Sequence, residues 1–312
     1  MAKTAFLFPG QGAQYPGMAK DLWGYSVKVK ELFEYASDIV KLDLKKLLFE
    51  GTEEELKATD KTQISVTLAS LSASTVLKEN GINPEGFAGF SLGEYSALSE
   101  AGVLKLEDIF NIVKVRGELM EKASRELDSA EGNAGMAAVI GLTFDKAVSI
   151  LEGLQGKNVY LANYSSPTQV VLSGTANGLS AAEAAFKDAG ARRFIRLKVS
   201  GPFHSPLLES ARKGLADFLS DIEFSDPEKA VYANVSGDRI NSGEDAKKYC
   251  IQQVVSAVKW VTEEENLLRD GFDTVYEVGP GKVLSGLWRS FNRDIVCTPA
   301  GTLDAVKQIL EG

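Results

Sequence analysis

The sequence predicts an α/β protein whose larger part carries a mostly parallel sheet and whose smaller part is an inserted βαββαβ unit. Two apolar runs, residues 5–8 and 274–278, have the length of buried strands, and each ends at a Pro/Gly turn. Between them, long stretches show the 3.6-residue periodicity of helices. The third observation is a change of pattern between residues 133 and 198, where short strand-like and helix-like segments alternate.

Helical periodicity follows the first strand from residue 18 to residue 79. One apolar stripe comprises Leu32, Phe33, Ala36 and Val40, and a second comprises Ile64, Leu68, Leu71 and Thr75. We expect these helices to cover the sheet and to carry no chemistry of their own. Further helices are predicted at residues 92–101 and 106–127. After His204, a helix at 207–219, a strand around 231–234 and helices through 268 lead to the last buried strand.

The smaller unit has the order of a ferredoxin-like fold. The pattern predicts strands at 134–140, 159–163, 169–173 and 193–199, with helices at 144–154 and 179–189. This βαββαβ order is the split arrangement of that fold.

Composition limits the classes of function. With 312 residues and 44% hydrophobic content, the chain can bury a sizeable core, in one large domain or two unequal ones. The net charge of −9 argues against nucleic acid or an anionic membrane as the main partner. Cys250 and Cys297 lack the spacing of metal ligands, and the chain has one histidine, so no metal site is expected. No signal-peptide core or membrane span is apparent, which favours a cytoplasmic protein.

Ser91 is the candidate nucleophile. It lies in Gly89-Phe90-Ser91-Leu92-Gly93, a G-x-S-x-G pattern between a short apolar run and a helix-compatible stretch. That context is typical of a nucleophile elbow, where a serine is exposed on a sharp strand-to-helix turn. The alternative, a glycine-rich turn with an ordinary helix-capping serine, is about equally favoured by the pattern alone.

His204 is the single candidate for a catalytic base, because a serine hydroxyl most often needs a histidine to become nucleophilic. It lies in a predicted loop between a strand and a helix, where catalytic side chains tend to occur. An ordinary loop histidine is the alternative. Only the fold can bring His204 to Ser91, since the two are far apart in the sequence.

Arg116 is a charge in the middle of an apolar helical stripe that includes Ile112, Leu119 and Met120. A buried guanidinium needs an anionic partner. Its partner is either a carboxylate of the protein or a carboxylate of the substrate, which arginine binds with bidentate geometry.

Several motifs in order make the whole chain resemble the bacterial malonyl-CoA:acyl carrier protein transacylases. The motifs are Phe8-Pro9-Gly10-Gln11-Gly12, Gly89-Phe90-Ser91-Leu92-Gly93-Glu94-Tyr95-Ser96-Ala97, Arg116-Gly117, Asn163 with Ser166-Pro167 and Gln169-Val170-Val171, Gly201-Pro202-Phe203-His204, Gln253 seven residues before Trp260, and Glu277-Val278-Gly279-Pro280-Gly281-Lys282.

The resemblance implies a large α/β-hydrolase-like subdomain at residues 1–130 and 200–312, interrupted by the small ferredoxin-like subdomain at 131–199. The active site would lie between the two. It also implies ping-pong transfer of malonyl from malonyl-CoA to the phosphopantetheine thiol of acyl carrier protein, with no cofactor, as in fatty-acid synthesis. A monomer is expected.

The same resemblance assigns roles to individual residues. Ser91 and His204 would form a catalytic dyad, and Arg116 would bind the malonyl carboxylate. The backbone N–H groups of Gln11 and Leu92 would form the oxyanion hole, and the backbone carbonyl of Gln253 would orient His204. Asn163 would contribute to a coenzyme A or substrate loop.

Three positions refine this reading of the sequence. Phe90 stands where many members have histidine, and Ser165 stands where asparagine is frequent. Phe203, just before His204, resembles the malonyl-selective pattern of polyketide acyltransferases and favours malonyl over methylmalonyl.

A basic run near His204 is a candidate docking surface for an acidic carrier protein. An overall negative chain needs a local basic patch to attract such a partner. The run comprises Lys187, Arg192, Arg193, Arg196 and Lys198, and strand alternation places Arg192, Arg196 and Lys198 opposite Ile195 and Leu197. A solvated sheet face is the alternative.

Other functions remain open at this point. A serine esterase or thioesterase on an α/β-hydrolase sheet would need neither Arg116 nor a carrier, but the chain lacks an H-G-G-G-type oxyanion loop. A catalytically inactive carrier-binding subunit is disfavoured by the presence of nucleophile, base and arginine. An acyltransferase serving a polyketide synthase is the third alternative.

Overall fold

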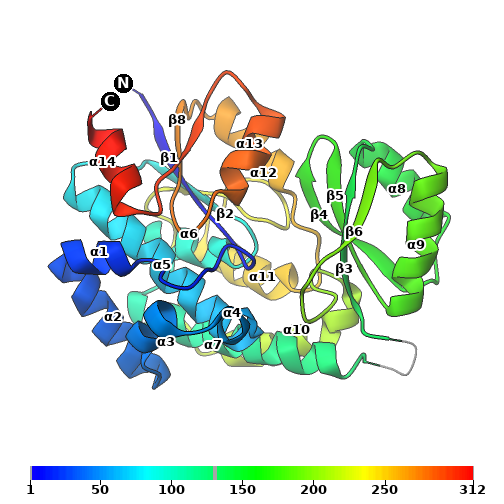
Figure 1. The fold of residues 1–312 in the computed structure, drawn as a ribbon, viewed down its shortest axis with the longest axis horizontal. Helices are drawn as coiled ribbons and strands as arrows, with labels where there is room; N and C mark the ends of the chain where they lie inside the picture. The colour runs from blue at the N-terminus through cyan, green and yellow to red at the C-terminus, as the bar shows by residue number, and fades with distance from the viewer. Residues whose placement is uncertain (1, 129–131, 312) are drawn as a thin grey trace.

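The computed structural model describes residues 2–128 and 132–311, and within them it contains a five-stranded and a four-stranded sheet (Figure 1). The larger sheet has the order β7-β2-β1-β8-β9, and every neighbouring pair is parallel. Its strands are β1 (Thr4–Phe8), β2 (Gly86–Gly89), β7 (Ala230–Val231), β8 (Thr274–Glu277) and β9 (Cys297–Pro299). The predicted fold class is confirmed.

Strand alternation gives the larger sheet two apolar faces, as expected for a parallel sheet covered on both sides. Phe6, Phe8 and Phe87 belong to the core cluster on one face, whereas Leu7 and Ala88 belong to the cluster on the other. The second face packs against α12 (Trp260–Arg269) and α13 (Val283–Phe291). The first face joins the helices α1 (Lys20–Tyr25), α2 (Val27–Val40), α3 (Leu44–Glu50), α4 (Glu53–Lys57), α5 (Thr59–Glu79), α6 (Gly93–Glu100), α7 (Leu106–Arg125), α10 (Glu209–Leu219), α11 (Gly243–Gln253) and α14 (Leu303–Glu311).

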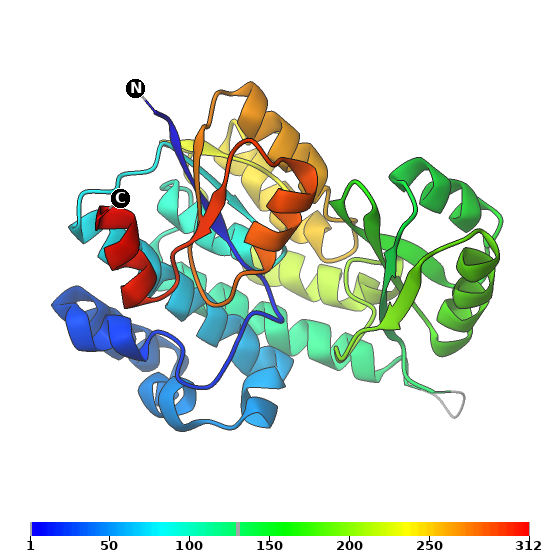
Figure 2. The same ribbon diagram turned by 45° about the horizontal axis from the view of Figure 1, so that its top comes forward.

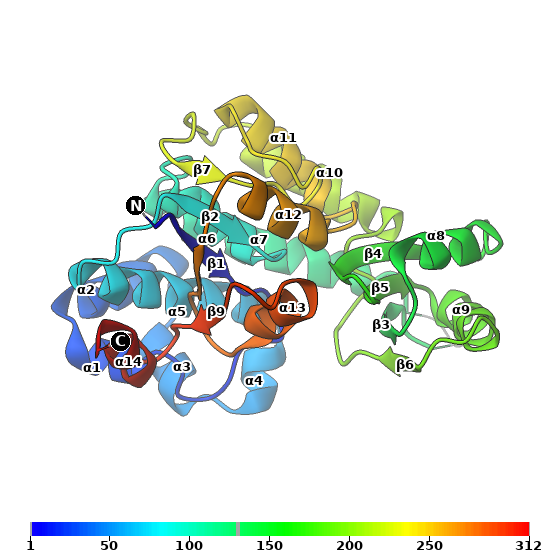
Figure 3. The same ribbon diagram turned by 90° about the horizontal axis from the view of Figure 1, so that it is seen from above.

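The smaller sheet lies at one end of the molecule in all three views (Figures 1, 2 and 3). It is antiparallel with the order β4-β5-β3-β6. Its elements are β3 (Gly135–Ile140), α8 (Phe144–Glu152), β4 (Val159–Ser166), β5 (Gln169–Gly174), α9 (Ala176–Asp188) and β6 (Arg193–Arg196), in the predicted βαββαβ order. The expected subdomain boundary at residues 130 and 131 falls outside the described residues.

The two faces of the smaller sheet have different partners. Val139 and Leu172 pack with α8 and α9 in a separate core cluster. Met136 and Val171, on the other face, join the main core of the larger part. The small unit is therefore attached to the large part through an apolar sheet face.

Three elements differ from the sequence pattern. The strand β6 ends at Arg196, before the expected end at residue 199, although the N–H of Leu197 still donates to the carbonyl of Met136 on β3 at 2.9 Å. The segment expected as a strand around 231–234 forms a regular strand at Ala230–Val231, followed by one more bond from Tyr232 N–H to the Phe87 carbonyl, and a turn closed by Gly237 N–H to Ala233 C=O ends it. The helix expected from residue 207 begins with a 3-10 turn, Pro206–Leu208.

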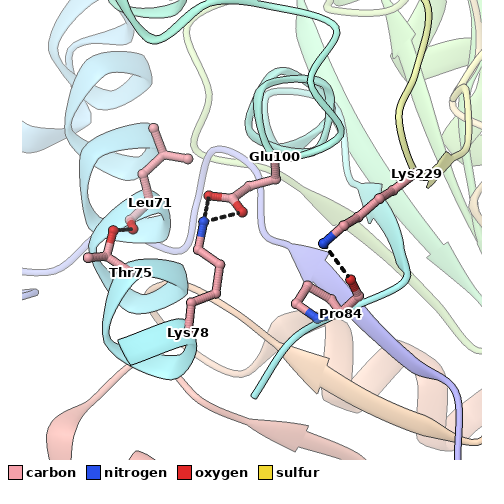
Figure 4. Close-up of polar contacts among 6 residues, drawn as sticks. All are labelled: Leu71, Thr75, Lys78, Pro84, Glu100 and Lys229. Carbon is pink, nitrogen blue, oxygen red and sulfur yellow. Dashed lines mark hydrogen bonds and ion pairs between the residues drawn. The ribbon is translucent and has the colours of Figure 1, made fainter. Parts of the chain in front are cut away.

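Polar contacts fasten the elements around β2, the strand that leads to Ser91 (Figure 4). Lys78 at the end of α5 forms an ion pair of 2.7 Å with Glu100 at the end of α6. Lys229, just before β7, donates a hydrogen bond of 2.9 Å to the carbonyl of Pro84, just before β2. These contacts fix the helix and the neighbouring strand on which the candidate nucleophile depends. In the described part of the chain, no helix is long and apolar enough to cross a bilayer.

Candidate active site

Ser91 lies on a tight turn between β2 and α6 with the geometry of a nucleophile elbow. Its φ of 53° is in the left-handed region, which is uncommon for a residue with a side chain. The flanking glycines are required by close packing: a Cβ on Gly89 would lie 2.0 Å from the backbone carbon of Gly93, and one on Gly93 would lie 2.0 Å from the carbonyl oxygen of Phe8. The G-x-S-x-G spacing therefore encodes a turn that only this arrangement of glycines allows.

Two buried amide side chains form hydrogen bonds with the backbone of Ser91. Its N–H donates to Oδ1 of Asn234 at 2.7 Å, and its carbonyl accepts from Nε2 of Gln253 at 2.9 Å. Nδ2 of Asn234 also donates to the carbonyl of Gly89 at 2.7 Å. Both sides of the turn are thus fixed by residues from distant parts of the chain.

His204 meets Ser91 directly, with its Nε2 2.7 Å from Ser91 Oγ. Its Nδ1 lies 2.8 Å from the backbone carbonyl of Gln253, which can only accept. Nδ1 must therefore carry the proton in the neutral ring, which leaves Nε2 as the acceptor for the serine hydroxyl. The orienting group is a carbonyl, so the pair forms a dyad without a carboxylate on the ring.

The loop that carries His204 is also strained and pinned. His204 has a φ of 58°, and it is almost fully buried. The hydroxyl of Ser173 on β5 donates to the carbonyl of Phe203, and Ser205 Oγ donates to the carbonyl of Pro202 at 2.6 Å. The small sheet therefore helps to place the base.

Burial, and second the nearby Arg116 guanidinium, lower the pKa of His204 from 6.5 to about 4. Both effects penalise the imidazolium form. The ring is neutral at neutral pH and is ready to accept the proton of Ser91.

Arg116 on α7 points its guanidinium at the nucleophile. One terminal nitrogen donates to Oε1 of Gln63 at 2.8 Å, and the other donates to Oε1 of Gln253 at 2.8 Å and lies 3.3 Å from Ser91 Oγ. Its Nε has no hydrogen-bond partner, although the side chain is 1% exposed. Among the described residues, no carboxylate lies within ion-pair distance of it. A direct salt bridge between Arg116 and a protein carboxylate is therefore absent from this part of the chain.

Two backbone N–H groups near Ser91 are available to a ligand. A Cβ on Gly10 would lie 2.5 Å from the carbonyl oxygen of Phe90, so the loop carrying Gln11 passes against the elbow. Leu92 follows the nucleophile at the N-terminus of α6, where backbone N–H groups favour negative charge. In residues 2–128 and 132–311, neither Gln11 N–H nor Leu92 N–H donates to an acceptor of the protein. This is the arrangement that an oxyanion hole requires.

Phe90 and Asn163 have their own contacts outside the group formed by Ser91, His204 and Arg116. The Phe90 ring packs edge-on against Trp260, with ring centroids 5.4 Å apart. Asn163 lies inside β4, which continues to Ser166, and it forms an isolated bridge to Val258. Its Oδ1 is buried without a hydrogen-bond partner.

The basic run is not part of this constellation. Arg192, Arg196 and Lys198 are exposed, and Arg196 lies against α9, where it contacts Ser180 Oγ at 3.2 Å and Glu183 at 3.9 Å. Phe194, on the same strand face, belongs to the apolar cluster under α9. Arg196 is therefore already paired within the small unit.

Sequence reasoning missed three residues of the site: Gln63 on α5, Glu94 on α6 and Asn234 after β7. We expected α5 to carry no chemistry, and that expectation is wrong because Gln63 contacts Arg116. Glu94 directly follows Gly93 of the G-x-S-x-G motif. A carboxylate on the first turn of a helix usually only complements the helix dipole, so the sequence gives no signal that Glu94 belongs to the site. Asn234 was read as part of a strand. Their burial was the missing signal.

Comparison with known proteins places this site in a family context. The model of the acyl transferase domain family matches residues 5–296. The chain is 40% identical over 295 residues to the malonyl CoA-acyl carrier protein transacylase of Bacillus subtilis, covering 94% of this chain and 92% of that protein. It is similar to the crystal structure of MCAT from Streptococcus pneumoniae, with a TM-score of 0.93, 35% identity and 99% of each chain covered. A malonyl-transacylase solved in complex with a type II polyketide synthase acyl-carrier protein has the same TM-score, identity and coverage.

Proposed function

The chain belongs to the acyl transferase domain family, and we propose that Ser91 and His204 carry out the malonyl transfer for which its relatives are named. The enzyme transfers malonyl from malonyl-CoA to acyl carrier protein. The reaction is a ping-pong acyl transfer through a malonyl-serine intermediate, and its product feeds fatty-acid synthesis.

One observation supports the assignment more than any other: base and anion-binding group converge on a single oxygen. Ser91 Oγ lies 2.7 Å from His204 Nε2 and 3.3 Å from the Arg116 guanidinium, which has no carboxylate partner among the described residues. A thioesterase acting on neutral acyl groups would have no use for a buried guanidinium that is not directly paired with a carboxylate and that points at that oxygen. Malonyl carries the carboxylate that this cation needs.

The first half-reaction forms the acyl-enzyme. His204 takes the proton of Ser91, and Oγ forms a bond to the malonyl thioester carbon. The oxyanion that develops is held by the backbone N–H groups of Gln11 and Leu92. When the tetrahedral intermediate collapses, the carbon–sulfur bond breaks, and His204 gives the proton to the departing coenzyme A thiolate.

The second half-reaction reverses these roles. The phosphopantetheine thiol of the carrier gives its proton to His204, and its sulfur attacks the malonyl carbon. The carbon–Oγ bond then breaks, and the proton returns to Ser91. Arg116 holds the free carboxylate throughout, so the acyl carbon stays oriented toward both nucleophiles.

Several further assignments belong to the same proposal. The large subdomain comprises residues 1–130 and 200–312, and the small one comprises 131–199. Asn163, with its unpartnered buried Oδ1, contributes to the coenzyme A or substrate region. The carrier docks on Arg192, Arg196 and Lys198. The enzyme acts in the cytoplasm as a monomer. Light scattering at working concentration tests the monomeric state.

The proposal is tested by mass spectrometry of the intact protein after brief mixing with malonyl-CoA. The expected result is one malonyl adduct that maps to Ser91 and disappears when carrier protein is added. An adduct on another residue, or hydrolysis without an adduct, would contradict the mechanism.

A polyketide carrier is the second candidate acceptor, favoured by the relative solved with a type II polyketide synthase acyl-carrier protein. Transfer rates from the malonylated enzyme to a fatty-acid carrier and to a polyketide carrier separate the two. Faster transfer to the polyketide carrier would indicate that the enzyme serves polyketide synthesis.

A further inference from the structure

We propose that Glu94 is a positioning residue that increases the selectivity of the enzyme for malonyl over acetyl. It acts on the Arg116 guanidinium through the side-chain amide of Gln253. This inference rests on the proposed role of Arg116 as the site for the malonyl carboxylate. It concerns the side chain of Gln253, whereas the orientation of His204 uses that residue's backbone carbonyl.

The three side chains form a continuous buried chain of hydrogen bonds. Arg116 donates to Oε1 of Gln253 at 2.8 Å, and Nε2 of Gln253 donates to Oε2 of Glu94. Glu94 and Gln253 are completely buried, and Arg116 is nearly so. In the part of the chain that the structure describes, neither the guanidinium nor the Glu94 carboxylate has an ion-pair partner. Each buried charge therefore has the other, one amide away, as its countercharge.

The two charged ends fix the orientation of the amide between them. A guanidinium can only donate hydrogen bonds, and an ionised carboxylate can only accept them. Gln253 must therefore turn its oxygen to Arg116 and its nitrogen to Glu94. Nε2 of Gln253 also donates to the carbonyl of Ser91 at 2.9 Å and to Oδ1 of Asn234 at 3.3 Å. A neutral residue at position 94 would remove the charged acceptor and leave the nitrogen side of the amide held by these two neutral oxygens, which bind it less strongly.

The indirect arrangement keeps the positive charge available. A direct carboxylate–arginine pair would be bidentate and would occupy the donors that a substrate needs. Here Arg116 is balanced across an amide, and it still presents a terminal nitrogen to Ser91 Oγ and an unpartnered Nε. Glu94 thus lowers the cost of burying the cation without competing with malonyl.

Glu94 is itself held by the elbow. Its Oε1 accepts the backbone N–H of Asn234 at 3.3 Å, and its own N–H donates to the carbonyl of Ser91 at 3.1 Å. Burial raises the pKa of Glu94 to about 7, against the opposing effects of Gln253, Asn234 and Arg116. At about pH 8 most of the carboxyl is therefore ionised, so the experiment is done at that pH.

The experiment compares Glu94→Gln with Gln253→Met in single-turnover acylation of Ser91 by malonyl-CoA and by acetyl-CoA. Glu94→Gln removes the charge at constant shape, and Gln253→Met removes the amide while keeping the backbone carbonyl. The quantity measured is the malonyl/acetyl ratio of acylation rates. Both variants are expected to lower it by about tenfold or more, the scale of one charge-assisted hydrogen bond.

A matched control is Glu263→Gln, another completely buried glutamate, which bonds Asn234 at 2.9 Å and not Gln253. It reaches the Gln253 amide only through Asn234, whose Oδ1 lies 3.3 Å from Nε2 of Gln253, so it should slow both substrates alike and leave the ratio within about twofold. If Glu94→Gln and Gln253→Met also slowed both substrates alike, Glu94 would serve the fold only, and the inference would be wrong.

Arg116→Ala, measured in parallel, separates this inference from the proposed function. A ratio that falls in Arg116→Ala but not in the other two variants overturns only the role of Glu94. A ratio that Arg116→Ala leaves unchanged overturns the carboxylate site itself. If Glu94→Gln does not fold, an unchanged ratio in Gln253→Met still overturns the inference, because the amide is the necessary link.

Discussion

Replacing Arg116 by alanine should remove the preference for malonyl over acetyl that we propose this residue supplies. The guanidinium has a terminal nitrogen directed at Ser91 Oγ and an Nε without a partner, so it offers two donors to a carboxylate. Each charge-assisted hydrogen bond contributes about 1.5–3 kcal/mol. Two bonds at the lower limit give about 3 kcal/mol, and kcat/KM for malonyl-CoA should fall by about 100-fold.

Acetyl-CoA has no free carboxylate and gains nothing from that charge, so its acylation rate should stay within a few-fold of the parent rate. The substitution also leaves the side-chain oxygens of Gln63 and Gln253 without a donor, at about 1–3 kcal/mol each. The variant will therefore unfold at a lower temperature, and circular dichroism must show that it is folded at the assay temperature.

The assay is stopped-flow or quenched acylation of Ser91 by each thioester, without carrier. Arg125→Ala is the matched control, since Arg125 lies on the same helix but is exposed and pairs with Glu121. It should change neither rate. Equal losses for malonyl and acetyl in Arg116→Ala would refute the reasoning, because they would show a structural cation.

Three further outcomes are expected. Ser91→Ala and His204→Ala should each abolish transfer, and the double variant should be hardly worse than either, because a nucleophile and its base fail together; near-parent rates in His204→Ala would require another base. The pKa of His204, lowered to about 4, keeps the ring neutral above that pH, so the acid limb of the acylation profile should lie near pH 4, and a limb near 6.5 would contradict the burial argument. Arg196→Glu with Lys198→Glu should raise the KM for carrier protein several-fold while malonylation of Ser91 stays nearly unchanged, with strong salt dependence in the parent enzyme; equal slowing of both half-reactions would place the docking surface elsewhere.

The elements of this fold were predictable where local sequence chemistry dominates. Apolar runs ending at Pro/Gly turns gave β1 and β8, and the βαββαβ order of the small unit followed from short-range periodicity. The ends of β6 and β7 were not predictable, because the pairing of Leu197 and Tyr232 depends on Met136 and Phe87, which lie in other segments. Strand ends depend on what the neighbouring layer offers, and periodicity within a segment carries no record of that layer.

The sequence by itself identified three candidate site residues, each by its type or its spacing. Ser91 stands between glycines whose close contacts require them, His204 is the single histidine, and Arg116 is a charge inside an apolar stripe. Only the tertiary structure decided what surrounds them. Gln63, Glu94 and Asn234 look like ordinary polar residues along the chain, and they become part of the site because segments far apart in sequence bury them together. Burial makes their hydrogen bonds obligatory and couples the charge of Glu94 to that of Arg116, and burial is a property of the packed molecule.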